Sequence, residues 1–317
     1  MCKTTVIIPN YNGLHFMEDC LASLRESTVP YKLIVVDNGS TDGSIDWLVN
    51  NGIEHIALES NTGFSHAVNC GIKAAETEFV LLLNNDTVAE PDFIEELEKA
   101  LTANEDAFAV SAQMIKASDH SLIDSAGDGM SIVGWAYQRG IDEPAENYQK
   151  PCEVFSACAG AAIYRRSIME KIGYFDEMHF AYLEDIDVSW RAQLAGYRVY
   201  YEPKAKVYHL GSATSGSKYN DFKVRLTSRN NILLHYKNLS PLQKVVNFIP
   251  LECGIIGKAV FFARRGYTKP YWEGIREGRK IRRQCVKAPY AGAAHLRIEG
   301  ILIKGFFEYL KSYLGRH

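Results

Sequence analysis

A single carboxylate, Asp86, follows an apolar run at residues 80–83 and is preceded by two amides, Asn84 and Asn85. Carboxylate and amide oxygens are ligands that suit Mg²⁺ or Mn²⁺. Since ligands of open α/β sheets bind beyond the carboxyl ends of the strands, one interpretation is a metal on Asp86 that faces a diphosphate. Asn and Asp also form turns, and a plain turn is the alternative interpretation.

Three acids, Glu184, Asp185 and Asp187, stand at the start of a helix predicted over residues 185–195. Acids at this position complement the positive end of the helix dipole. Asp187 has Arg191 four residues later, which predicts a surface ion pair. Glu184 and Asp185 have no comparable structural role. Because the dipole favours an ionised carboxylate there, these two are candidates for a proton-accepting base.

A lone histidine, His209, lies in the segment 207–211, which is expected to follow a strand at residues 197–201. A lone histidine is more often structural than a metal ligand. If Asp86 holds a metal, however, the imidazole of His209 is suited to complete a Mn²⁺ site.

Polar residues also follow the other predicted strands of the first half. Pro9 and Tyr11 follow the first strand, where Tyr11 is placed to pack on a nucleobase, and a buried tyrosine is the alternative. Asp37 follows the second strand and is placed to hydrogen-bond a base or a ribose, with a plain turn at residues 37–39 as the alternative. Residues 61–64 open a helix whose free backbone N–H groups are able to meet an anion.

An alternation of strands and helices must position these residues. Apolar runs and helical spacing predict strands at 5–9, 33–36, 53–58 and 79–83, and helices at 14–27, 43–50, 63–75 and from Pro91 onward. We expect Ser40 or Thr41 to cap the second helix. The repeated strand–helix order predicts an α/β fold with parallel strands and right-handed crossovers. Residues 107–154 are strand-rich and irregular, and a further helix is predicted at 221–237.

Two common nucleotide-binding motifs are missing from the sequence. The loop at residues 10–13 contains one glycine rather than G-x-G-x-x-G, and no G-x-x-x-x-G-K-[ST] loop occurs. A dehydrogenase and a P-loop NTPase are therefore disfavoured. A nucleotidyltransferase would need a cation in the loop at residues 10–13, which has none.

The net charge of −3 hides an asymmetry along the chain. Residues 240–317 contain 15 Lys and Arg against 5 Asp and Glu, whereas the remainder contains 20 against 33. Because apolar residues are mixed with these cations, the segment is typical of helices that lie on a membrane surface. An extra helical subdomain or a homodimer contact is the alternative.

The seven cysteines are scattered and form no C-x-x-C pair, which favours a reducing compartment. The chain runs directly into its first predicted strand without a signal peptide, and it has no run of about 18 apolar residues. We therefore expect a cytoplasmic protein, either soluble or peripheral on the inner face of the cell membrane.

Taken in order, these motifs resemble those of a family 2 inverting glycosyltransferase with the GT-A fold, in particular its rhamnosyltransferase-like branch. The segments that carry the resemblance are VIIPNYN at 6–12, VDNGSTDGS at 36–44, NTGFS at 61–65, LNNDT at 83–87, GYFDE at 173–177, EDIDVSWR at 184–191 and VYH at 207–209. The resemblance implies a GT-A domain at 1–239, with a nucleotide-sugar half at 1–105 and an acceptor half at 106–239. A basic amphipathic helical extension at 240–317 would follow it.

The resemblance also implies a role for each candidate residue. The donor, a nucleoside-diphosphate sugar, would be bound by Pro9, Tyr11, Asn12, Asp37, Gly63, Asn84 and Asn85. Asp86 and His209 would hold a divalent metal, Mg²⁺ or Mn²⁺, and Asp185 would be the catalytic base with Glu184 beside it. Asn84 departs from the family's D-x-D motif, so Asp86 is the only acid of that motif.

The activity implied by the resemblance is transfer of rhamnose or another hexose from a dTDP- or UDP-linked donor. The acceptor would be a glycan or a polyprenyl-diphosphate-linked sugar, as in cell-wall or polysaccharide biosynthesis, and no nucleic acid is expected as a partner. A non-catalytic sugar-nucleotide sensor or scaffold is the alternative, suggested by the missing acid at Asn84. That alternative leaves Glu184, Asp185 and His209 unexplained.

Overall fold

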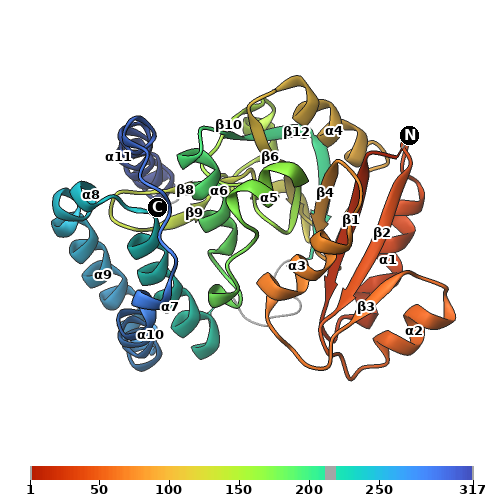
Figure 1. The fold of residues 1–317 in the computed structure, drawn as a ribbon, viewed down its shortest axis with the longest axis horizontal. Helices are drawn as coiled ribbons and strands as arrows, with labels where there is room; N and C mark the ends of the chain where they lie inside the picture. The colour runs from red at the N-terminus through yellow and green to blue at the C-terminus, as the bar shows by residue number, and fades with distance from the viewer. Residues whose placement is uncertain (1, 211–218, 316–317) are drawn as a thin grey trace.

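The computed structural model describes residues 2–210 and 219–315 of the chain (Figure 1). Its centre is a ten-stranded sheet in the order β10-β12-β6-β11-β4-β1-β2-β3, with β5 paired to β12 and β7 to β6. These strands are β1 (Thr4–Asn10), β2 (Tyr31–Asp37), β3 (His55–Ala57), β4 (Phe79–Leu83), β5 (Thr87–Ala89), β6 (Ala107–Lys116), β7 (Asp119–Ser125), β10 (Cys152–Glu153), β11 (Ala161–Arg165) and β12 (Arg198–His209). A separate hairpin pairs β8 (Asp128–Met130) with β9 (Ala136–Gln138).

The first four strands form the parallel part of the sheet. β1 pairs in parallel with both β2 and β4, and β2 pairs in parallel with β3. β11 is antiparallel to both β4 and β6, so β6 and its parallel neighbour β12 run in the same direction as the first four. The predicted α/β fold with a mostly parallel sheet is confirmed.

Side-chain alternation along the strands divides the core between the two faces of the sheet. Val6 and Ile8 of β1 pack in one core and Ile7 packs in the other, and all three are fully buried. The first core is covered by α1 (Leu14–Arg25), α2 (Ser44–Asn50) and α4 (Phe93–Ala103), and the second by α3 (Phe64–Ala74), α5 (Arg166–Ile172) and α6 (Glu184–Leu194). Helices therefore cover both faces of the central sheet.

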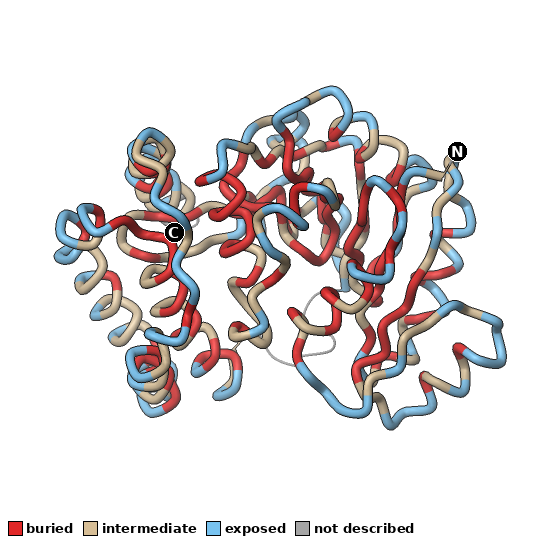
Figure 2. The backbone as a smooth tube through the Cα atoms, in the orientation of Figure 1, coloured by how far each residue is buried: buried red, intermediate tan, exposed pale blue. Residues whose placement is uncertain are grey.

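A group of helices packs at the end of the molecule opposite β3 (Figure 1). It consists of α7 (Asp221–Asn238), α8 (Pro241–Val246), α9 (Phe248–Ala263), α10 (Thr268–Ile281) and α11 (Gly292–Gly315), and the short 3₁₀ helices of the chain are η1 (Ala145–Tyr148), η2 (Glu177–His179) and η3 (Arg282–Gln284). One apolar cluster joins Trp190 of α6 to Leu234 of α7 and Leu302 of α11. Among the described residues, none of the helices is both long and apolar enough to span a membrane. Figure 2 shows exposed segments around the periphery of the molecule, including α8 at one end and α2 at the other, whereas the central strands are mostly buried.

Three expected boundaries differ from the structure. Pro91 was expected as the first residue of the helix, but α4 begins at Phe93 with Asp92 as its N-cap. Pro91 instead belongs to the turn before the helix, which is closed by the N–H of Phe93 donating to the carbonyl of Glu90. The cap of α2 is Gly43, at φ +89°, because the hydroxyl of Ser40 instead accepts the N–H of Asn12. The strand expected at 197–201 continues to His209 as β12, since a register shift accommodates the proline at position 203.

Candidate active site

Buried amides join the carboxyl ends of three neighbouring strands. Asn85, which follows β4, donates from Nδ2 to Oδ1 of Asn10 at 2.7 Å, and Asn10 donates from Nδ2 to Oδ2 of Asp37 at 2.8 Å. The other oxygen of Asp37 accepts the N–H of Ser40 at 2.9 Å. Asn10, Asp37 and Asn85 are all at most 5% exposed, so this network fixes the loops after β1, β2 and β4 relative to one another.

The residues expected to hold the nucleoside lie around this network. Tyr11 is 39% exposed, so the alternative of a buried tyrosine is wrong. Asn12 lies beside it with φ +51°, and its Oδ1 accepts the N–H of Thr41 at 2.7 Å. Pro9 pairs with Val36 within the sheet. Asp37 is fully buried, and each of its oxygens accepts one of the hydrogen bonds described above, so in this state it organises the loops.

The helix opening at Gly63 differs from expectation. The N–H of Gly63 donates to Oδ1 of Asn61, and the N–H of Ser65 donates to the carbonyl of Phe180. A Cβ at Gly63 would also lie 2.6 Å from the ring of Phe180. The N–H of Thr62 likewise donates to Oδ1 of Asn38. The expectation of free N–H groups at 61–64 that meet an anion is therefore wrong at Thr62 and Gly63, because the chain itself supplies their acceptors.

Strand register places Asp86 beside His209. β5 pairs antiparallel with the end of β12 so that Thr87 lies opposite His209, and the N–H of Leu210 donates to the carbonyl of Asp86. The carboxylate Oδ1 of Asp86 consequently lies 3.3 Å from Nε2 of His209. On the other side of the ring, Oδ2 of Asp124, from β7, lies 2.8 Å from Nδ1. The segment 207–209 is thus the end of a strand rather than the loop after it.

The ring of His209 is held between two carboxylates. Burial lowers its pKa, but the hydrogen bonds and charges of Asp124 and Asp86 outweigh that effect and raise the pKa to about 9. Asp124 accepts the Nδ1–H of His209, and this hydrogen bond directs Nε2 of the ring at the carboxylate of Asp86. Either a proton on Nε2 or a bound cation must then balance the negative charge of Asp86. A carboxylate that orients a ligating histidine in this way is typical of metal sites, so Asp86 and His209 fit a divalent cation.

The two acids at the start of α6 are differently placed. Glu184 is 6% exposed, and its Oε2 has no hydrogen-bond partner among the described residues. Burial, followed by the charge of Asp185, raises the pKa of Glu184 well above its ordinary value. Burial also raises the pKa of Asp185, to about 6, but the N–H groups of Ile186 and Ala159 limit the change by bonding its carboxylate. Asp185 is therefore the better proton acceptor at neutral pH.

The helix dipole, predicted to favour ionised carboxylates at Glu184 and Asp185, does not dominate there, since the net effect at both positions is a raised pKa. Removal from water outweighs the dipole, because a carboxylate loses far more free energy on desolvation than a helix end returns.

The ion pair between Asp187 and Arg191 is buried, whereas the sequence predicted a surface ion pair. The side chain is fully buried, and Oδ2 accepts from Nε of Arg191 and from Nζ of Lys237, both at 2.9 Å. Asn238 donates to Oδ1 at 2.8 Å. These cations keep the pKa of Asp187 below its ordinary value in spite of burial. The network links α6 to α7 within one turn of Glu184 and Asp185, the two candidate bases.

The loop before α6 has an unusual backbone. Phe180, Tyr182 and Leu183 have φ values of +62°, +71° and +68°, a region that residues with a Cβ rarely adopt. Asn230 of α7 stabilises this loop, because its Nδ2 lies 2.8 Å from each of the carbonyl oxygens of His179, Ala181 and Tyr182. Sequence reasoning missed Asn230, for which the only signal was a polar residue within a helix.

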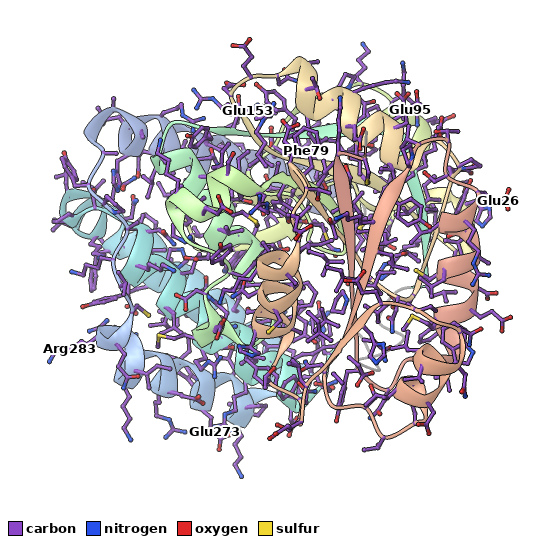
Figure 3. The ribbon with its side chains drawn as sticks, turned by 45° about the vertical axis from the view of Figure 1, so that its right-hand side comes forward. Glu26, Phe79, Glu95, Glu153, Glu273 and Arg283 are labelled. Atoms are coloured by element: carbon purple, nitrogen blue, oxygen red, sulfur yellow. The ribbon has the colours of Figure 1, made fainter. Side chains whose placement is uncertain are left out.

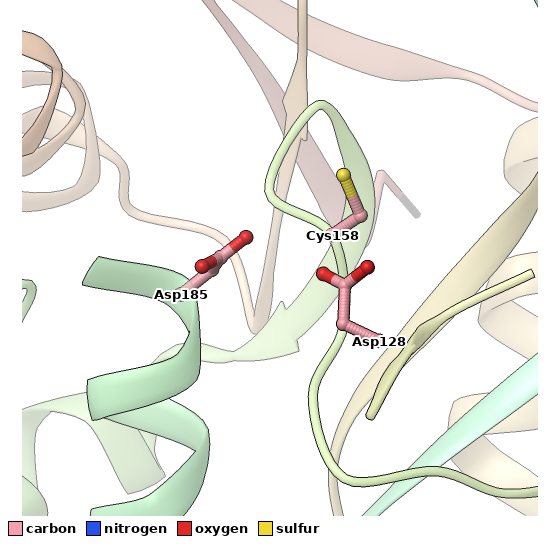
Figure 4. A group of neighbouring side chains, drawn as sticks. All are labelled: Asp128, Cys158 and Asp185. Carbon is pink, nitrogen blue, oxygen red and sulfur yellow. The ribbon is translucent and has the colours of Figure 1, made fainter. Parts of the chain in front are cut away.

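Two further acids extend the site. Asp128, at the start of β8, is 7% exposed, and its carboxylate lies within 4.8 Å of Asp185 and of the thiol of Cys158. Figure 4 shows Asp185 on the first turn of α6, across from Asp128 and Cys158. Burial and then the charge of Asp185 raise the pKa of Asp128 well above its ordinary value. Asp124 and Asp128 escaped sequence reasoning because residues 119–130 match no motif that it used.

The turn at residues 158–160 connects the two parts of the site. The N–H of Asn84 donates to the carbonyl of Gly160 at 2.8 Å, and the Asn84 side chain lies against Gly160. On the other side of the turn, the thiol of Cys158 lies within 4.8 Å of the Asp185 carboxylate, and the backbone N–H of Ala159 lowers the pKa of that carboxyl. One short turn therefore touches both the segment that ends in Asp86 and the candidate base, so the structure brings these two predicted elements together.

Comparison with known proteins identifies related sequences. The family described as glycosyl transferase family 2 matches residues 5–173. Poly-beta-1,6-N-acetyl-D-glucosamine synthase of Staphylococcus epidermidis is 27% identical over 215 residues, which cover 65% of this chain and 49% of that protein. Its counterpart in Staphylococcus aureus strain COL is 25% identical over 217 residues, or 67% of this chain and 51% of that protein. The chain thus spans about half the length of these curated relatives.

Solved structures share the fold at low identity. Staphylococcus aureus TarS 1-349 in complex with UDP-GlcNAc has a TM-score of 0.56 at 17% identity, covering 96% of this chain and 92% of that one. The mannosyltransferase PcManGT from Pyrobaculum calidifontis, in complex with GDP-Man and Mn²⁺, has a TM-score of 0.53 at 18% identity, covering 89% and 86%. At these identities the likeness establishes the arrangement of the elements.

Proposed function

Because this chain belongs to glycosyl transferase family 2 and has the GT-A fold, we propose that it transfers a sugar from a nucleoside-diphosphate sugar to an acceptor hydroxyl with inversion. The observation that supports the proposal is the turn at 158–160, because Gly160 accepts the N–H of Asn84 and the thiol of Cys158 lies within 4.8 Å of the Asp185 carboxylate. A base next to a corner suited to a cation and a diphosphate is the arrangement that a single displacement needs.

In the proposed reaction Asp185 accepts the proton of the acceptor hydroxyl. The hydroxyl oxygen then bonds to the anomeric carbon as the bond from that carbon to the diphosphate oxygen breaks, and the nucleoside diphosphate leaves with the electron pair. Asp86 and His209 would hold a divalent cation, which when bound would supply positive charge against that diphosphate. Burial raises the pKa of Glu184 and so favours its neutral form, which adds no second negative charge beside the base.

The donor side of the proposal assigns the nucleoside to the loops after the first two strands. Tyr11 offers an exposed ring for stacking on the base, and Asn12 offers an amide for its edge or its ribose. Asp37 would join them by exchanging a hydrogen bond to Asn10 or Ser40 for one to the nucleoside. Gly63, Asn84 and Asn85 complete the wall on the sugar and diphosphate side. Since the related synthases are named for poly-N-acetylglucosamine and TarS was solved with UDP-GlcNAc, UDP-N-acetylglucosamine is the first donor to test, alongside dTDP-rhamnose.

The acceptor half is proposed to lie at residues 106–239, with helices of the segment 240–317 in contact with a membrane surface. Several large apolar side chains are exposed on α8 and α9, namely Leu242, Val245, Val246, Phe248, Ile249 and Ile256. α10, which follows them, contains Lys269, Arg276, Arg279 and Lys280. Exposed apolar side chains next to such a basic helix favour an anionic bilayer surface. A glycan carried on a lipid diphosphate is the acceptor that this location suits.

Donor binding and transfer measured on Asp185→Asn test the function. The panel is UDP-N-acetylglucosamine, dTDP-rhamnose and GDP-mannose, each with and without Mn²⁺. The variant should bind the donor as the unmodified chain does and lose roughly 10²–10⁴-fold in transfer rate, the usual contribution of a general base. Near-normal turnover would shift the role to Glu184, while donor binding without turnover by the unmodified chain would favour the sensor function.

A further inference from the structure

Three cations surround one aromatic ring in the helical layer. The ammonium groups of Lys244 and Lys287 lie 4.8 and 5.0 Å from the ring centre of Tyr236, and the guanidinium carbon of Arg282 lies 5.5 Å from it. They come from α8, from the segment after η3 and from η3 itself, whereas Tyr236 belongs to α7. The fold therefore assembles this cluster from separate parts of the chain.

The positive charge of this cluster is not balanced within the described residues. None of Lys244, Arg282 and Lys287 forms an ion pair with a carboxylate there, and Lys244 donates only to the backbone carbonyl of Tyr236, at 2.6 Å. Burial, and after it the charges of Lys287 and Arg282, lower the pKa of Lys244. The electron-rich face of the Tyr236 ring offsets part of this positive charge through cation–π interactions. Like charges gathered around one ring leave a strong attraction for an anion.

A cavity of mixed polar and apolar lining opens beside the cluster. It has a volume of about 220 Å³ and lies between α7, α9 and α10. Leu239, Phe248, Leu251 and Ile255 line one part of it, and Lys244 and Arg282 line another. The acid that lines it, Glu252, is paired with Arg279 at 3.4 Å. The cavity thus combines a hydrocarbon wall with an unneutralised cationic edge.

This combination matches an amphiphile with an anionic head. We propose that the Tyr236 cluster binds the phosphate of an anionic lipid through Lys244, Arg282 and Lys287, with the start of the lipid chain against Phe248, Leu251 and Ile255. Free phosphate lacks the chain that the apolar wall would accept, and a zwitterionic lipid lacks the net charge. The proposal extends the membrane contact proposed above to one defined site, and it does not depend on sugar transfer.

The position of the site connects it to the candidate base. α7 contributes Tyr236 to the lipid site, and its next residue, Lys237, bonds Asp176 and Asp187 beside α6. A lipid bound at Tyr236 would therefore lie against α7, whose Asn230 stabilises the loop at 179–183 before Asp185. Figure 3 labels Arg283, the residue after Arg282 in η3, at the outer edge of the helical layer.

Calorimetric titration with short-chain lipids tests the site without a bilayer. Dihexanoyl phosphatidic acid should bind at least tenfold more tightly than dihexanoyl phosphatidylcholine or inorganic phosphate. The combined variant Lys244→Gln, Arg282→Gln, Lys287→Gln should lose at least tenfold in affinity for phosphatidic acid, since each cation near an anionic headgroup contributes severalfold. Equal binding of inorganic phosphate would overturn the lipid assignment.

A charge-matched control separates a site from general attraction. Lys269→Gln, Arg276→Gln, Lys280→Gln removes three exposed cations from α10 and should change the affinity less than threefold. Equal losses in the two variants would overturn the proposal. Lys287→Glu, at an exposed position, provides a second test in case the triple variant misfolds. It should also weaken binding of phosphatidic acid, and an unchanged thermal unfolding temperature would show that the variant is folded. Because donor binding is measured separately, failure of sugar transfer would leave this result interpretable.

Discussion

Replacement of Asp185 by asparagine should stabilise the protein at neutral pH while it abolishes transfer. Burial raises the pKa of Asp185 from 3.8 to about 6 against the opposing effect of the Ile186 and Ala159 N–H groups. One pKa unit corresponds to about 1.36 kcal/mol, so this shift in pKa means that an ionised Asp185 destabilises the native state by about 3 kcal/mol. Asparagine has the same shape and retains an oxygen for an N–H group, but it has no charge to desolvate.

The sign of the pH dependence follows from which state binds the proton. Between pH 3.8 and about 6, the native carboxyl of Asp185 holds a proton that the unfolded chain has released. The free energy of unfolding of the unmodified chain therefore falls as pH rises through this interval, and the lower value persists above it. The variant lacks this contribution, so its advantage should be about 3 kcal/mol at pH 7.5 and less than about 1 kcal/mol at pH 4.

Urea unfolding at pH 4, 5 and 7.5, without donor or divalent metal, measures this difference. Asp19→Asn, at an exposed position on α1, is the control and should change stability by less than about 0.5 kcal/mol. A gain that does not vary with pH, or no gain at pH 7.5, would refute the reasoning. In parallel, transfer by the unmodified chain should decline below about pH 6 as Asp185 becomes protonated.

Three further substitutions test the supporting residues. Asp124→Asn should weaken Mn²⁺ binding roughly 10–100-fold, because His209 loses the charge that orients it, and direct metal titration measures this; unchanged affinity would contradict the proposed site. Asn230→Ala removes three hydrogen bonds from the 179–182 loop and should destabilise by about 2–4 kcal/mol in urea unfolding, whereas a loss below 1 kcal/mol would show that the loop holds itself. Gly13→Ala places a Cβ against the Asn85 amide and should weaken donor binding in calorimetry; normal affinity would argue against the amide network.

The parallel half of the fold was predictable because its signals are local. The apolar runs of β1, β2 and β4 have the length and composition of strands buried on both faces, and helical spacing separates them. Once these strands are parallel, the residues that follow them must meet at one edge of the sheet. Asn10, Asp37 and Asn85 are joined there by hydrogen bonds, as that order requires.

The chain sequence therefore determined the α/β class, the family resemblance and the edge at which the polar residues gather. Tertiary structure alone decided which acids share one environment. Asp124 reaches His209 across 85 positions, and Lys237 reaches Asp187 across 50, through strand and helix packing that no local pattern encodes. It also decided the protonation of the base, because the helix dipole at Asp185 is a property of nearby sequence, whereas desolvation depends on everything that the fold packs around it.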